Sequence, residues 1–73
     1  MTEEVLSPIL QFLENHPEYN VTTLARDCKV SRVTLSRVAN GKQKPLFDTG
    51  ERIRKVTSIR YERLLDYYRS VNG

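Results

Sequence analysis

Two short runs of apolar residues, separated by a break of three residues, constrain this chain more than any other feature of its sequence. They lie in residues 21–41, which read VTTLARDCKVSRVTLSRVANG. The apolar side chains of the first run recur with the spacing of one helix face, at Val21, Leu24, Ala25 and Cys28. The second run covers residues 33–38 and follows the break at residues 29–31. This spacing predicts two short helices that cross at a steep angle, because three residues leave no room for a gradual turn.

Residues that favour helix ends stand at the ends of both of these helices. Asn20 is a favoured N-cap and predicts a first helix over about residues 21–28. Ser31 can cap the second helix, which is expected over about residues 32–40. Gly41 then fits the left-handed position just past the helix end.

An earlier helix is expected near residues 3–15, and its start has two alternatives. Thr2 can cap it, but Pro8 would then lie inside the helix, where a proline removes a hydrogen bond and clashes. The other alternative has Ser7 as the cap and Pro8 at the first helical position. In both cases the helix should stop before Pro17, which disfavours helical geometry in the residue that precedes it.

The remaining residues carry two further helical patterns. Asp48 or Thr49 can cap the first of them, and Thr57 or Ser58 can cap a last helix over about residues 58–71. The two helices could instead run together without a break. No segment alternates apolar and polar residues for long, as a strand would. The sequence therefore predicts an all-α fold, a compact bundle of about five short helices.

Length and composition narrow the classes of protein to consider. Residues 1–73 are enough for one domain with a thin core, since a chain this small buries only about 60% of its unfolded surface. No apolar run approaches the roughly 20 residues of a membrane span, and the N-terminus is acidic where a signal peptide would be basic. The single cysteine, Cys28, lies on the apolar stripe and should be buried; with one histidine it cannot build a zinc site. We expect a cytoplasmic protein with neither a metal nor a cofactor.

Charge is distributed unevenly along the chain, although the net charge is only +3. Residues 1–20 hold four glutamates and no lysine or arginine, whereas residues 28–47 hold five basic side chains and no acidic one. Residues 48–73 are mixed. An acidic beginning and a basic middle predict one electropositive face. A solvated surface that happens to be basic is the alternative interpretation of the charge pattern.

The stretch VSRVTLSRVANG, residues 30–41, resembles the DNA-binding segment of lac repressor-type regulators. It shares the Val-Ser pair, a Thr-hydrophobic-Ser-Arg-Val run and the closing Asn-Gly. The short chain, with its expected number and order of helices, is more similar to lambda repressor/Cro-type regulators. Both families use a helix-turn-helix, whose second helix enters the major groove of DNA. The resemblance implies that the helices near 21–28 and 32–40 form this motif.

The resemblance also implies roles for single residues. Arg32, Val33 and Arg37 take the positions that read base edges. The residues expected to contact the DNA backbone are Arg26, Lys29, Ser31, Thr34, Ser36, Asn40, Lys42 and Lys44. For the last two lysines, a solvated loop without contacts is the alternative. Lys29 stands where these regulators commonly have glycine, so we expect it in a left-handed conformation at some cost in strain.

The last helix is unusually apolar for a chain end. One of its faces should close the core. A second face is expected to pair with a twofold mate through Tyr61, Leu64, Tyr68 and Val71. Dimers of this type place their recognition helices one DNA turn apart, roughly 34 Å, and a single small module seldom binds tightly alone. The alternative is that the whole helix serves the monomer's own core.

These observations predict a sequence-specific, double-strand DNA-binding transcriptional regulator, a small phage- or plasmid-type repressor that binds its operator as a homodimer in the bacterial nucleoid. No small-molecule effector is evident, because the length leaves no room for an effector-binding domain. Two alternatives remain: an excision or replication accessory factor that shapes DNA, and an antitoxin-like autoregulator that binds a protein partner through residues 59–73. An enzyme is not expected, since no carboxylate pair, metal cluster or phosphate loop appears. His16 and Ser31 likewise lack the partners of a catalytic group.

Overall fold

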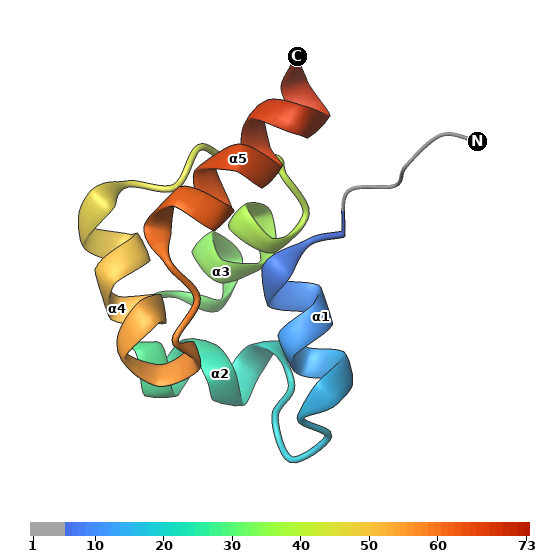
Figure 1. Cartoon of the computed structure of the whole chain (residues 1–73). Coiled ribbons are helices and arrows are strands. Elements are labelled where there is room, and N and C mark those ends of the chain that lie inside the picture. Colours follow the sequence, from blue (N-terminus) through green and yellow to red (C-terminus); the bar gives the residue numbers. More distant parts are fainter. Residues whose placement is uncertain (1–5) are drawn as a thin grey trace.

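The computed structural model describes residues 6–73, and in this part of the chain it contains five helices and no strand. The helices are α1 (Pro8–Asn15), α2 (Val21–Cys28), α3 (Arg32–Ala39), α4 (Phe47–Thr57) and α5 (Tyr61–Asn72). α2 packs against α3 and α4, α1 packs against α3 and α5, and α4 packs against α5. The loop between α3 and α4 passes behind α5 in Figure 1. The predicted all-α fold with about five helices is confirmed.

Apolar side chains from all five helices, and from the turn before α5, meet in one core. They are Ile9, Leu24, Ala25, Cys28, Leu35, Val38, Ala39, Ile53, Ile59 and Leu64. Cys28 is only 2% exposed, as the apolar stripe predicts. Burial raises the pKa of its thiol to about 11, so the side chain stays protonated and unreactive near neutral pH.

α1 begins at the second of its two predicted starts. The Ser7 hydroxyl accepts a hydrogen bond from the amide of Leu10 at 3.4 Å, and Pro8 occupies the first helical position. The same hydroxyl donates to the carbonyl oxygen of Ala39 at 2.6 Å, which ties the start of α1 to the end of α3. The alternative cap, Thr2, lies outside the described residues.

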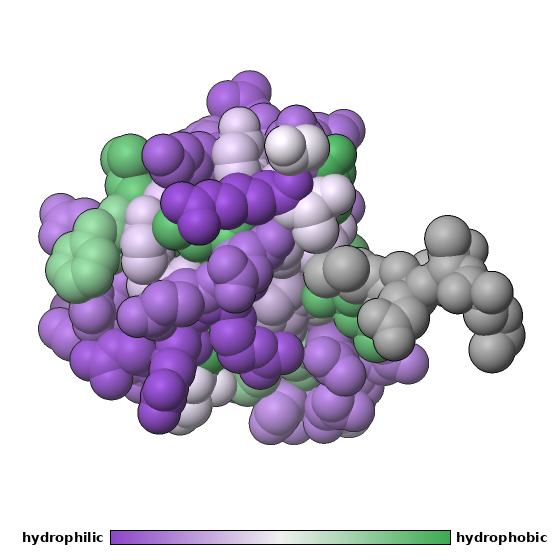
Figure 2. Space-filling model, turned by 45° about the horizontal axis from the view of Figure 1, so that its top comes forward, coloured by the Kyte–Doolittle hydropathy of each residue, from purple (hydrophilic) through white to green (hydrophobic). Residues whose placement is uncertain are grey.

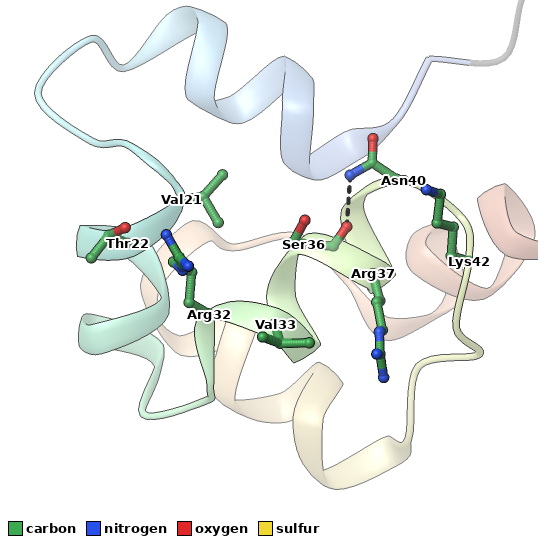
Figure 3. Close-up of a pocket in the computed structure, with 8 residues that line it drawn as sticks. All are labelled: Val21, Thr22, Arg32, Val33, Ser36, Arg37, Asn40 and Lys42. Atoms are coloured by element: carbon green, nitrogen blue, oxygen red, sulfur yellow. Dashed lines mark hydrogen bonds between the residues drawn. The ribbon is translucent and has the colours of Figure 1, made fainter.

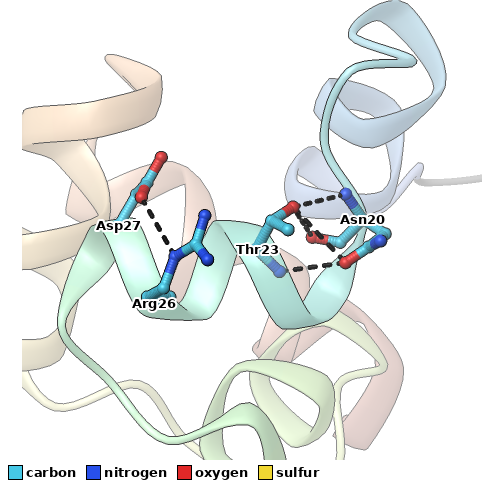
Figure 4. A network of polar contacts seen from close by, with 4 residues as sticks. All are labelled: Asn20, Thr23, Arg26 and Asp27. Atoms are coloured by element: carbon cyan, nitrogen blue, oxygen red, sulfur yellow. Dashed lines mark hydrogen bonds and ion pairs between the residues drawn. The ribbon is translucent and has the colours of Figure 1, made fainter.

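α2 has the ends that its sequence predicts. The side-chain oxygen of Asn20 accepts from the Thr23 amide, and the Thr23 hydroxyl accepts from the Asn20 amide, both at 2.9 Å (Figure 4). This reciprocal pair satisfies two amides that the first helical turn would otherwise leave without a partner. At the other end, Lys29 adopts the left-handed conformation, with φ 58° and ψ 39°.

α3 also follows its predicted signals. The hydroxyl of Ser31 caps the helix by accepting from the Thr34 amide at 3.0 Å. The helix ends at Ala39, one residue earlier than expected, with Asn40 as the C-cap. Gly41 has a φ of 70°, which confirms its left-handed position.

The strain at Lys29 leads to a stability prediction. Replacement of Lys29 by glycine should leave the protein about 1 kcal/mol more stable than replacement by alanine. The left-handed conformation costs an L-residue about 1 to 2 kcal/mol, and the greater freedom of glycine in the unfolded chain offsets up to about 1 kcal/mol of this gain. Both variants lose the same charge, so urea unfolding of the pair isolates the backbone effect. Identical free energies of unfolding would contradict it.

The predicted start of α4 is wrong. The helix begins at Phe47, before both Asp48 and Thr49, and its N-cap is Leu46, which makes no side-chain capping bond. The preceding Pro45 is fully buried, so tertiary packing sets where the chain enters the helix. Asp48 instead lies in the first turn, where its negative charge suits the positive end of the helix dipole.

α4 and α5 are separate helices, and the predicted caps of α5 are wrong. Ser58 is the left-handed C-cap of α4, with φ 63°, and Arg60 is the residue before α5. The Thr57 hydroxyl donates to the carbonyl oxygen of Ile53 at 2.8 Å and accepts from the amide of Ile59 at 3.2 Å. Thr57 and Ser58 therefore close α4, and burial of Ile59 in the core bends the chain between the two helices.

Candidate nucleic-acid interface

α3 has one buried face and one face open to solvent. Leu35, Val38 and Ala39 are buried in the core. The opposite face carries Arg32, Val33, Ser36 and Arg37, whose i, i+4 spacing brings them together on the helix surface. Val33 is 52% exposed although it is apolar. An apolar side chain held out between two arginines is suited to contact a partner that has both charged and apolar groups.

This open face borders a hollow of about 430 Å³ (Figure 3). Its lining residues are Val21, Thr22, Arg32, Val33, Ser36, Arg37, Asn40 and Lys42. In Figure 3, Val33 and Arg37 project from the same side of α3, and Thr22 of α2 lies beside Arg32. The structure thus brings together all three predicted base readers and three of the predicted backbone contacts.

The lining of the hollow is positively charged. Its described residues include two arginines and one lysine but no acidic side chain. Within residues 6–73, these three basic groups form no ion pair. Their hydrogen-bond donors are therefore available to an anionic partner, and the hydroxyl groups of Thr22 and Ser36 add neutral donors and acceptors. Chemically, the hollow is equipped to bind phosphate groups and hydrogen-bond acceptors.

The cap of α3 uses two of the predicted backbone contacts internally. The Ser31 hydroxyl donates to the Thr34 hydroxyl at 2.8 Å, in addition to accepting from the Thr34 amide. Among the described residues, the amides of Arg32 and Val33 have no acceptor. These first-turn amides point away from the helix at its positive end, which is a favourable place for an anion.

Asn40 closes the other end of this face. Its side-chain amide nitrogen donates to the carbonyl oxygen of Ser36 at 2.8 Å (Figure 3). This bond holds the Asn40 side chain against the last turn of α3, beside the hollow.

Besides the two residues of the N-terminal cap of α3, three more of the predicted backbone contacts lie outside the hollow. Arg26 is 75% exposed, and its Nε lies 3.8 Å from a carboxylate oxygen of Asp27, a loose pair that contributes little (Figure 4). The carbonyl oxygen of Lys29 accepts from the Arg52 guanidinium at 3.0 Å. Lys44 is exposed on the loop before α4. A long ligand would have to extend past the hollow to reach these three residues.

Sequence reasoning missed two residues of the hollow, Val21 and Thr22. Val21 belongs to the predicted buried stripe of α2, but it is only half-buried and reaches the edge of the hollow. Thr22 is exposed in the first turn after the Asn20 cap. The sequence does predict that Thr22 points outward from α2. Its place in the hollow, however, follows only from the position of α3 beside that turn.

Of the four residues of α5 predicted to form a dimer face, one is buried in the monomer and three keep exposed surface, with Val71 52% exposed. Leu64 is 3% exposed and belongs to the core, so it cannot contact a second copy. The Tyr61 ring packs edge-on against Phe47, with centroids 5.4 Å apart. Tyr68 is half-buried, and Val71 packs on the loop after α3. On the face shown in Figure 2, hydrophilic side chains predominate and the apolar ones form separate patches.

Within residues 6–73, no helix has the length and apolar character needed to cross a membrane. This part of the chain also holds no group of three or more histidine, cysteine or acidic side chains placed to bind a metal ion.

Comparisons of the chain with protein-family models, with curated proteins and with solved structures found no match.

Proposed function

We propose that this protein is a sequence-specific regulator of transcription that binds double-stranded DNA through a helix-turn-helix formed by α2 and α3. The open, basic face of α3 carries the proposal. On this face, Arg32, Val33 and Arg37 line a hollow that has no acidic side chain in its lining. The opposite face of the helix is buried. A rigid helix that presents arginines and one apolar side chain matches the chemistry of the major groove.

Each group on this face has a corresponding partner in DNA. The guanidinium groups of Arg32 and Arg37 can donate two hydrogen bonds to the O6 and N7 of guanine. Val33 can pack against the methyl group of thymine, the apolar feature of that groove. Thr22 and Lys42 flank the helix and are placed to donate to phosphate oxygens on either side. In this arrangement α3 selects the DNA sequence, and the residues beside it orient the protein on the DNA.

In this proposal the protein represses transcription by occupying an operator as a homodimer. Reading by one helix covers only a few base pairs, and two copies related by a twofold axis read an inverted repeat. The buried Leu64 restricts how α5 can contribute to such a dimer. Leu6 and Leu10 are 60% and 41% exposed and provide apolar surface beside the start of α1.

Selection from a library of random duplexes tests the proposal. The purified protein is incubated with DNA at near-physiological salt, and the bound duplexes are sequenced. We expect a short inverted repeat with half-sites about 10 base pairs apart. The Arg37→Ala variant, selected in parallel, should lose part of each half-site.

Other outcomes separate the rivals. Enrichment without a shared motif would contradict sequence reading and favour an accessory factor that binds phosphates. Failure to retain any duplex would reject DNA binding and leave a role in binding a protein partner.

A further inference from the structure

The basic loop between α3 and α4, residues 40–46, is hydrogen-bonded at two points to α5. The side-chain amide of Asn72 donates to the carbonyl oxygen of Gly41 at 2.7 Å. The hydroxyl of Tyr61 donates to the carbonyl oxygen of Pro45 at 3.0 Å. Tyr61 and Asn72 are the first and last residues of α5, so the helix holds the loop near both of its ends.

Both attachment points are also tightly packed. Gly41 is buried, and a Cβ atom added to it would lie 3.2 Å from side-chain carbons of Val71. Pro45 is fully buried. The ring of Tyr61 covers Gly50 so closely that a Cβ there would clash with it. These contacts make the two hydrogen bonds part of packed junctions.

Only four residue steps separate Gly41 from Pro45, a span of at most about 14 Å when fully extended. The chain bends within this span, with a turn at Gly41 and bends at Lys42 and Gln43. Figure 1 shows the loop crossing behind α5. A short segment attached at both ends has little freedom to move.

Two basic side chains lie on the part of the loop between the junctions. Lys42 lines the hollow beside α3, and its amide donates to the carbonyl oxygen of Arg37 at 2.9 Å. Lys44 is exposed two residues further on. The backbone on either side of this pair is fixed, while both ammonium groups remain in solvent.

We propose that α5 is a brace that positions Lys42 and Lys44 for the phosphates of bound DNA, with Tyr61 and Asn72 as positioning residues. The inference rests on the proposed function and adds to it a helix that does not itself touch the ligand. A loop ordered before binding loses less conformational entropy when its lysines meet phosphates. Tyr61 and Val71, two members of the predicted dimer face, both contact the loop and so belong to the brace.

A double variant tests the brace without disturbing the core or the charge. Tyr61→Phe combined with Asn72→Ala removes both donors to the loop. The matched control is Tyr67→Phe combined with Ser70→Ala, on the same helix. Among the described residues, the Ser70 hydroxyl bonds only to the carbonyl oxygen of Tyr67, and the Tyr67 hydroxyl has no partner. Circular dichroism checks that both proteins keep their helices.

The first readout is the mobility of the free protein, measured by NMR relaxation of the Gln43 and Lys44 amides. We expect order parameters of about 0.85 in the unaltered protein and the control, and below about 0.6 in the brace variant. Order parameters that stay high in the brace variant would overturn the brace.

The second readout is affinity for a random-sequence 20-base-pair duplex between 50 and 200 mM salt, with Lys44→Ala as the reference. The brace variant should bind about 3- to 10-fold more weakly, and the slope of log K against log salt should fall by about 1, as for Lys44→Ala. A loosened loop with unchanged affinity and slope would overturn the positioning role. If the unaltered protein binds no duplex, the proposed function fails, and the phosphate role of the brace fails with it. The mobility of the free loop still shows whether α5 holds it.

Discussion

Replacement of Arg37 by alanine is expected to weaken binding to the cognate operator by about 1 to 3 kcal/mol, roughly 5- to 150-fold. Arg37 lies on the open face of α3 and lines the hollow, and it makes no ion pair within residues 6–73. Within the same residues its side chain also makes no hydrogen bond, so its removal costs the described part of the free protein no polar interaction. Titration of the operator and of a duplex mutated in one half-site measures both affinity and selectivity.

Arg37→Lys is the matched variant for this experiment. It keeps the charge but loses the planar fork that can bond two acceptors of one guanine. We expect it to retain the salt slope of the unaltered protein while its preference for the cognate site falls. Equal affinity of Arg37→Ala and the unaltered protein for the operator would remove Arg37 from the recognition surface.

Replacement of Leu35 by alanine should destabilise the protein by about 2 to 5 kcal/mol. Leu35 is 0% exposed at the centre of the core, so its loss leaves a cavity under α3. A domain of this length is expected to have only about 4 to 11 kcal/mol of stability in total. The melting temperature should fall by about 10 °C or more, as measured by circular dichroism.

Val33→Ala is the control on the same helix. Val33 is 52% exposed, so we expect its replacement to change stability by less than about 0.5 kcal/mol. Its effect should appear in operator affinity, whereas Leu35→Ala should act through unfolding. Similar losses of stability in the two variants would contradict the orientation of α3.

The helices that sequence predicted well are those with strong local signals. The Asn20 and Ser31 caps and the left-handed conformations of Lys29 and Gly41 depend on residues within one turn of each other. A local capping interaction is worth about 0.5 to 2 kcal/mol and needs no distant partner. The ends of α2 and α3, and so the exposed face of α3, could therefore be predicted.

The second half of the chain was predicted less well, because its signals were ambiguous and packing decided among them. Asp48 and Thr49 were reasonable caps, yet burial of Pro45 starts α4 earlier. Leu64 looked available to a partner, but it lies in the core, whereas Val71 packs on Gly41 and is still 52% exposed. A helix pattern alone does not distinguish a face buried by its own chain from a face buried by another.

The residue pattern alone predicts the helical class, the two short helices around residues 29–31 and the basic character of the surface that α3 presents. The position of Thr22 on this surface, and the bonds from both ends of α5 to the basic loop, depend on how distant segments pack. These two groups of features differ in the sequence distance over which their interactions act. Caps and helix periods act within a few residues, whereas the bond from Asn72 to Gly41 joins residues 31 positions apart and requires α5 to be packed beside the loop.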